Sequence, residues 1–291
     1  MEAMKAVPSA TDPSKSQYQS LEAWLANDDK TKNTTVEELI IPPISASDHD
    51  IFAFFAGVPA IFFMFGTDFK KHKYPQQKQY PTYHTSFDTF YLVDKFLDPG
   101  FSIHKSCSQL GMHMMLQMAE SALLPLATRH FVAEVKNGIK DFEKKGTAKK
   151  LRDAGLDEPY KTLNASINEF AAASHMWTMR KNAMQRWSML ADDPMKARML
   201  NDQIMKFERL WIMPKGLPGR ENIRHAIFSP PQHGGPQFLP GISDLLHELH
   251  EAGTKDTKEY AEKLLELRKH LSDLMIMFRQ AASWLQPFDQ L

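Results

Sequence analysis

Residues 257–285 read TKEYAEKLLELRKHLSDLMIMFRQAASWL, and this stretch decides the fold of the chain. Its large apolar side chains recur at spacings of three and four residues: Leu264, Leu267, Leu271, Leu274 and Phe278. That period places them on one face of an α-helix. A single long apolar stripe is suited to packing among other helices, so the stretch predicts a helical bundle.

Earlier segments of the C-terminal half show the same helical period. Residues 163–190 place Phe170, Trp177 and Met184 seven apart on one face. Further helices are expected at residues 88–96, 103–124, 129–145 and 194–211. Residues 213–241 are rich in proline and glycine, which predicts an irregular connection before the last helices.

The N-terminal part has a different pattern. Val36–Ile41 and Pro59–Phe65 are short apolar runs that predict strands, and a helix is expected between them, from Asp48 to Ala56. This order of elements suits the end of an α/β sheet domain. We therefore expect residues 1–121 to belong to such a domain and residues 122–291 to form the helical one.

Composition excludes some classes of partner and leaves the compartment open. Lys+Arg and Asp+Glu both number 35, so no basic excess favours nucleic acid as a partner. The single cysteine, Cys107, has no second cysteine for an internal disulfide. Residues 1–15 contain no apolar run typical of a signal peptide. The most apolar stretch, residues 51–65, is about fifteen residues long, which is short for a membrane span.

Four segments together resemble one family, glutamate carboxypeptidase II and its transferrin receptor relatives. They occur in the family order and span nearly the whole chain. The segments are Ser47–Phe52 with Gly57–Pro59, Tyr80–His84 with Tyr91–Pro99, Leu200–Met205 with Phe207–Arg209, and Gly216–Pro218 with Arg224–Ile227 and Phe238–Ile242. The resemblance implies the last part of an α/β zinc-exopeptidase domain, followed by a helical dimerisation domain of the transferrin receptor type.

The resemblance also implies functional residues. His84 corresponds to a terminal zinc ligand, and Tyr83 to the tyrosine whose hydroxyl faces the reacting carbonyl; both roles suit the chemistry of these side chains. Ser47 and His49 fall in a region near the substrate cleft. The intact parent would hold two zinc ions, form a homodimer and cleave a terminal residue from peptides. Its catalytic region would be extracellular and membrane-anchored. The bridging aspartate, the other ligands and the catalytic base lie upstream of Met1 in the family.

Two departures from the family concern the substrate. Enzymes that trim acidic peptides carry an arginine pair in the strand after the Gly-Val-Pro turn, and Ala60–Phe65 contains no arginine. They also carry a Lys-Tyr pair that grips a C-terminal glutamate, and residues 230–237 lack it. The resemblance therefore does not imply a preference for acidic substrates, and the terminal residue removed stays open.

Each functional reading has a structural alternative. From composition alone, His84 is a polar histidine at a helix start, and Asp48 beside His49 is a natural helix cap. His247 and His250 are three apart, whereas the metalloprotease HExxH pattern needs four. We expect the isolated chain to be catalytically inactive. The alternatives are a non-enzymatic, receptor-like dimerisation module and a truncated reading frame.

Overall fold

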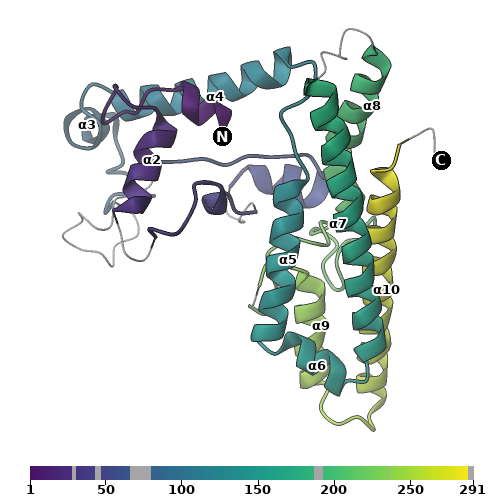
Figure 1. Ribbon diagram of the computed structural model, residues 1–291. Helices are drawn as coiled ribbons and strands as arrows, with labels where there is room; N and C mark the ends of the chain where they lie inside the picture. The colour runs from purple at the N-terminus through teal and green to yellow at the C-terminus, as the bar shows by residue number, and fades with distance from the viewer. Residues whose placement is uncertain (28–30, 43–46, 66–79, 187–192, 235, 288–291) are drawn as a thin grey trace. The chain divides into compact units, whose positions relative to one another are not determined.

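The computed structural model of the chain describes residues 1–27, 31–42, 47–65, 80–186, 193–234 and 236–287 (Figure 1). It divides into two compact units. The first, unit 1, comprises Met1–Ile41 and Phe62–Ser121; the second, unit 2, comprises Pro42–Ile61 and Ala122–Leu291.

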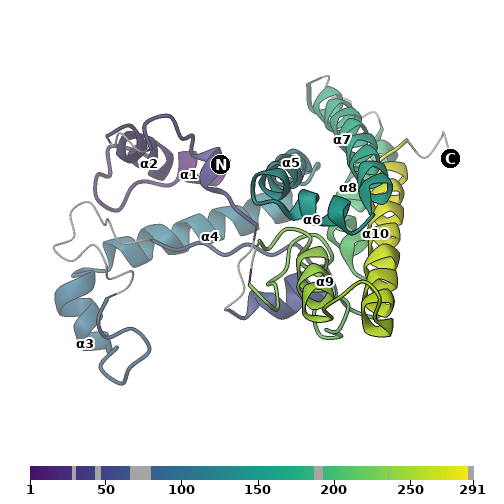
Figure 2. The same ribbon diagram turned by 90° about the horizontal axis from the view of Figure 1, so that it is seen from below.

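Unit 2 is a helical bundle, as the sequence predicts. Its helices are α5 (Arg129–Lys144), α6 (Thr147–Asp153), α7 (Asp157–Arg186), α8 (Pro194–Met205), α9 (Pro240–Glu251) and α10 (Lys258–Trp284), with a 3₁₀ helix, η4 (Phe207–Trp211), after α8. The long helices α7 and α10 pack side by side in both views and form the most extensive contact between elements (Figures 1 and 2).

The expected apolar stripes face the core of this bundle. Leu267, Leu271, Leu274 and Phe278 of α10 are fully buried, and Leu264 packs against them. On α7, Phe170 and Trp177 are fully buried and Met184 is buried. Phe131, Phe170, Phe207, Trp211 and Phe278 form an aromatic cluster, with ring centroids 5.0–6.1 Å apart.

A buried glutamine joins three helices at one end of the bundle. The Trp177 indole N–H donates to Gln203 Oε1 at 3.0 Å. The Gln203 side-chain amide donates to the carbonyls of Trp284 and Gln286 at 2.7 and 2.8 Å. Trp284 Nε1 donates back to the Gln203 carbonyl at 3.0 Å. Because buried polar groups are costly without partners, this reciprocal network fixes the mutual position of α7, α8 and the end of α10.

Local sequence signals set the helix ends. The Thr257 side chain accepts a hydrogen bond from the Tyr260 N–H and so caps α10. Asp193 does the same for α8, where Pro194 occupies the first turn. Each such cap satisfies a backbone N–H that the helix itself leaves without a partner.

Unit 1 is built on one long helix. Its elements are α1 (Glu2–Ala6), α2 (Gln17–Ala26), the 3₁₀ helix η1 (Glu37–Leu39), α3 (Phe90–Leu92) continued by the π-helical turn η3 (Val93–Leu97), and α4 (Ser102–Glu120). Ser106 of α4 connects it to the N-terminal segment. Its hydroxyl donates to the Pro8 carbonyl at 2.7 Å and accepts from the Gln17 amide at 2.6 Å.

The expected strands are not observed. The described residues contain only isolated β-bridges and no named strand. Residues 37–39 form a 3₁₀ turn, and residues 59–65 have no regular secondary structure. Ile61, Phe62 and Met64 are 66%, 51% and 67% exposed. A strand forms only by pairing its backbone with a neighbour, and no described segment pairs with these residues. The α/β part of the expected fold is therefore not confirmed.

The helix expected before this segment is present within unit 2. Ile51–Ala56 forms the π-helical element η2, which ends at Gly57 with φ of +62°. A Cβ at Gly57 would lie 2.6 Å from Ile212 Cγ1 and 3.0 Å from the Cα of Arg209. Only glycine fits this left-handed position against the backbone after α8. No helix among the described residues is long and apolar enough to cross a membrane.

Candidate functional site

Tyr83 and His84 lie in a hydrogen-bonded turn of unit 1 that precedes α3. Their rings stack, with centroids 3.9 Å apart and planes at 19°. The Thr85 hydroxyl donates to the Thr82 carbonyl at 2.7 Å and closes the turn around them. Both side chains are exposed, Tyr83 at 39%. The structure therefore presents the two residues together on a surface turn, not at the start of a helix.

The backbone of His84 is in an uncommon conformation. Its φ is +61°, which places it in the left-handed region that residues with a Cβ rarely occupy. Tyr80 anchors the turn, because its hydroxyl donates to Asp88 Oδ2 at 2.7 Å and its ring meets Tyr83 edge-on at 5.7 Å. The hydrogen bond to Asp88 raises the pKa of Tyr80 above its usual value, with burial and nearby charge adding to the effect.

Ser47 and His49 lie in unit 2, just before η2. Ser47 is exposed, and its carbonyl accepts from the Asp50 N–H at 3.0 Å. His49 is half-buried, with Nε2 3.5 Å from Asp50 Oδ1. The four sequence-predicted site residues thus form two adjacent pairs, one in each unit of the molecule.

The described residues do not assemble a zinc site. Among them, no group of three or more His, Cys, Asp or Glu side chains is placed to hold a metal ion. His247 stacks on His233 with ring centroids 4.4 Å apart, and Glu248 is held by Lys263 at 2.5 Å. This arrangement fits the structural reading of the His247–His250 segment.

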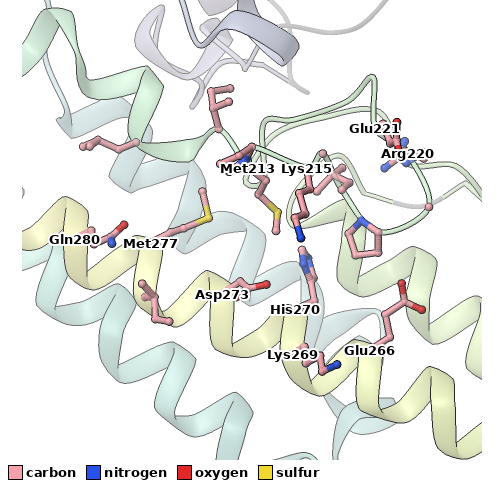
Figure 3. A pocket seen from close by; sticks show the side chains of 18 of the residues that line it. Met213, Lys215, Arg220, Glu221, Glu266, Lys269, His270, Asp273, Met277 and Gln280 are labelled. Carbon is pink, nitrogen blue, oxygen red and sulfur yellow. The ribbon is translucent and has the colours of Figure 1, made fainter.

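Unit 2 contains a hollow of about 990 Å³ between the loop at residues 209–221 and α10 (Figure 3). His270 lines it and is fully buried, and in Figure 3 its ring and the Lys215 side chain point toward each other. Neither ring nitrogen of His270 has a hydrogen-bond partner among the described residues. Burial lowers the pKa of His270 to about 4, so the ring is neutral at neutral pH.

A buried ion pair closes one side of this region. Arg220 Nη2 lies 2.8 Å from Asp244 Oδ2, with the Asp244 side chain only 3% exposed. Asp244 Oδ1 also accepts from the backbone N–H groups of Gln232 and His233, at 2.9 and 3.2 Å. Burial lowers the pKa of Arg220, and the Asp244 charge opposes that shift.

Sequence reasoning did not single out His270, Arg220 or Asp244. The signal available for His270 was a histidine directly beside Leu271 in the apolar stripe. The position of Arg220 between Gly219 and Glu221 gave no sign of burial.

Residues 158–286 match the family model of the transferrin receptor-like dimerisation domain. This stretch of the chain is therefore similar to that domain. The match covers α7, α8, α9 and α10 of unit 2.

Most of the chain is also similar to curated peptidases. It is 28% identical to the rat protein named aminopeptidase NAALADL1 over 85% of this chain and 31% of that protein. It is 26% identical to probable glutamate carboxypeptidase VP8 of maize, over 69% of this chain and 26% of that protein. It is 25% identical to probable glutamate carboxypeptidase LAMP1 of Arabidopsis, over 85% of this chain and 32% of that protein. The resemblance to the glutamate carboxypeptidase family is confirmed. The chain spans between about a quarter and a third of the length of these relatives.

Proposed function

We propose that this chain is a portion of a glutamate carboxypeptidase-like zinc exopeptidase and that its helical unit joins two copies into a homodimer. The observation that carries the proposal is the match of residues 158–286 to a dimerisation domain, on a unit whose helices form one continuous core. Residues 1–121 would then belong to the peptidase domain, and residues 122–291 to the dimerisation domain.

Exposed apolar side chains in unit 1 support its assignment to a larger domain. Large apolar residues on α3, η3 and α4 that are more than two-fifths exposed are Phe90, Tyr91, Phe96, Leu97, Met112, Met115, Leu116 and Met118. Soluble monomers rarely expose large contiguous apolar patches. Further peptidase-domain structure packed on unit 1 would cover these side chains.

His84 would contribute one zinc ligand, and the Tyr83 hydroxyl would face the carbonyl of the peptide bond. His84 supports this role because its ring nitrogens make no hydrogen bond among the described residues and its ring is exposed. Ser47 and His49 would lie near the substrate cleft. A catalytic zinc needs about three protein ligands, and the described residues supply no such group, so the chain by itself does not fit the metal.

A non-enzymatic, receptor-like dimerisation module is the second candidate. The match of residues 158–286 to a transferrin receptor-like dimerisation domain supports it. The sequence of the intact gene product separates the two candidates. Zinc ligands and a general base encoded elsewhere in the same protein would support the peptidase, and their replacement would support the receptor-like module.

Sedimentation velocity of the purified full chain tests self-association. We expect the sedimentation coefficient to rise with concentration toward that of a dimer between about 1 and 100 µM, the range of a modest protein interface. A single species with the mass of one chain, 33.3 kDa, across this range would contradict the proposed dimerisation.

A further inference from the structure

The hollow between the loop at residues 209–221 and α10 has the size of a ligand site and lies wholly within unit 2 (Figure 3). Its volume of about 990 Å³ is at the upper end of the roughly 300–1,000 Å³ range of small-molecule pockets. The α10 wall contains residues at steps of four and three, which share one helical face: Glu266, His270, Asp273, Met277 and Gln280. This face extends for about 21 Å, at 1.5 Å per residue.

The wall on the loop side is held in place by the loop's own backbone. The Leu217 N–H donates to the Ile223 carbonyl at 2.7 Å, and the Arg220 N–H donates to the Leu217 carbonyl at 2.8 Å. Gly216 turns the chain with φ of +78°, where a Cβ would lie 2.5 Å from the Arg220 carbonyl oxygen. The ion pair of Arg220 with Asp244 ties the end of this loop to α9. Because this wall is already formed, a ligand does not have to order it on binding.

Much of the lining is apolar, as in most small-molecule sites. Both walls contribute apolar side chains, which are Met213, Pro214, Leu217, Pro218, Ile276 and Met277. Methionine side chains are flexible and adapt to the shape of an apolar group. The hollow therefore offers an apolar surface to the body of a ligand, and its few polar groups decide which ligand fits.

Lys215 of the loop and Asp273 of α10 are charged side chains that line the hollow without partners. Neither of them takes part in a hydrogen bond or an ion pair within the part of the chain that the structure describes. Burial raises the pKa of Asp273 above its usual value, and no nearby cation opposes this shift. The ammonium and the carboxylate therefore do not neutralise each other, although they line the same hollow.

His270 adds a buried polar group to the same part of the hollow. In Figure 3 the ends of the Lys215 and Asp273 side chains both point toward its ring, whereas Lys269 and Glu221 point away from it. Both ring nitrogens of His270 lack a hydrogen-bond partner among the described residues, which is costly for a buried group. A neutral imidazole has one donor nitrogen and one acceptor nitrogen. A carboxylate that accepts from both His270 and Lys215 would satisfy these two groups together.

We propose that this hollow binds a small zwitterion with an apolar body, the chemistry shared by free amino acids and short peptides with free ends. The carboxylate accepts hydrogen bonds from Lys215 and His270, the ammonium pairs with Asp273, and the apolar body packs against Met213 and Met277. A simple anion fits less well because Asp273 repels it, and a simple cation fits less well because Lys215 repels it. The inference goes beyond the proposed function, since it concerns binding in unit 2 alone and depends neither on catalysis nor on self-association.

NMR of the full chain, with ¹³C-labelled methionine methyl groups, tests both binding and its location. The probes are leucine and alanyl-leucine, and single Met→Leu substitutions assign the signals. We expect saturable shifts of the Met213 and Met277 methyl signals, with a dissociation constant on the order of 1 mM for probes of this size. Met176 of α7 is exposed and lies outside the hollow, so its signal should not shift. The probe that binds more tightly shows whether the hollow prefers a free amino acid or a peptide.

Capped probes and charge-neutralising variants test the assigned contacts. N-acetylalanyl-leucine lacks the ammonium and alanyl-leucine amide lacks the carboxylate, so each cap should weaken binding to the parent at least fivefold. Asp273→Asn should remove the penalty of the acetyl cap, and Lys215→Gln should remove the penalty of the amide cap. The matched controls are Asp256→Asn and Lys258→Gln, at exposed positions outside the hollow, and they should keep both penalties. Circular dichroism should show the same helix content in all four variants.

Three results would overturn the proposal or part of it. If no probe shifts the Met213 and Met277 signals, the hollow holds only solvent and the proposal is wrong. If alanyl-leucine and its capped forms bind equally well, the hollow accepts apolar bodies and the zwitterion is not its ligand. If both penalties persist in Asp273→Asn and Lys215→Gln, the assigned contacts are wrong. None of these results bears on the proposed dimerisation, which sedimentation velocity tests separately.

Discussion

His270 of α10 is a fully buried ionisable side chain that has no hydrogen-bond partner within the described part of the chain. Burial lowers its pKa from 6.5 to about 4. Between these values the unfolded chain binds a proton that the folded chain does not. Protonation of His270 should therefore cost no stability above about pH 6.5. Below that pH, the free energy of unfolding should fall by up to about 3 kcal/mol as the pH approaches 4.

The variant His270→Leu isolates this contribution, because leucine has a similar volume and no titrating group. Urea unfolding, followed by tryptophan fluorescence at about pH 7 and about pH 4.5, should show a smaller loss of stability in the variant than in the parent. An equal pH dependence in both proteins would show that His270 is not buried in its neutral form. Carboxyl groups titrate in both proteins over this range. The informative quantity is therefore the difference between the two proteins in the stability that is lost from about pH 7 to about pH 4.5.

Gln203 shows what the sequence reveals at the level of single residues. The segment Leu200–Met205 marks the family resemblance, but nothing in it tells whether Gln203 binds substrate or holds the fold. The structure gives it a structural role. Its side-chain oxygen accepts from Trp177, 26 residues earlier, and its side-chain nitrogen donates to the carbonyls of Trp284 and Gln286, 81 and 83 residues later. Such long-range partners cannot be read from local spacing.

At the scale of elements, the packing of α5 against the loop before α9 depends on Gly138. A Cβ at this position would lie 2.3 Å from the ring carbons of Phe238, which is buried and packed against Phe142. In an isolated helix, alanine is favoured over glycine by about 1 kcal/mol, but overpacking a rigid core costs about 1–3 kcal/mol. We expect Gly138→Ala to lower the free energy of unfolding by up to about 2 kcal/mol, the overpacking cost less the propensity gain.

The neighbouring Asn137→Ala is the matched control for this variant. Asn137 is exposed on the same helix, so the higher helix propensity of alanine should leave stability equal to or slightly above that of the parent. Urea unfolding midpoints measure both variants under one condition. A Gly138→Ala protein more stable than the parent would mean that α5 and Phe238 are not in contact.

The helices of unit 2 were predictable because apolar residues recur with the helical period within each segment. The stripe from Leu264 to Phe278 requires one buried face, whatever it packs against. The expected strand at Pro59–Phe65 is not observed, for the opposite reason. Its apolar composition suits a strand, but a strand depends on a neighbour that composition does not specify.

At the scale of the whole molecule, the question is whether the chain alone can hold zinc and act on peptides. The resemblance identified Tyr83 and His84, and the structure describes them as an exposed, stacked pair in a turn. Two features were not predictable, because both depend on the path of the chain in space. One is the left-handed backbone of His84, and the other is that Ser47 and His49 belong to unit 2 whereas Tyr83 and His84 belong to unit 1.

One imidazole supplies one ligand, and a stable catalytic zinc needs about three. We therefore expect the purified chain, after loading with zinc and dialysis, to retain less than one zinc ion per chain. Elemental mass spectrometry measures this ratio. It should release no terminal residue from a peptide mixture, and His84→Ala should behave identically. Stoichiometric zinc that disappears in His84→Ala, together with zinc-dependent hydrolysis, would contradict this expectation. That result would mean that the chain completes the site from its own residues.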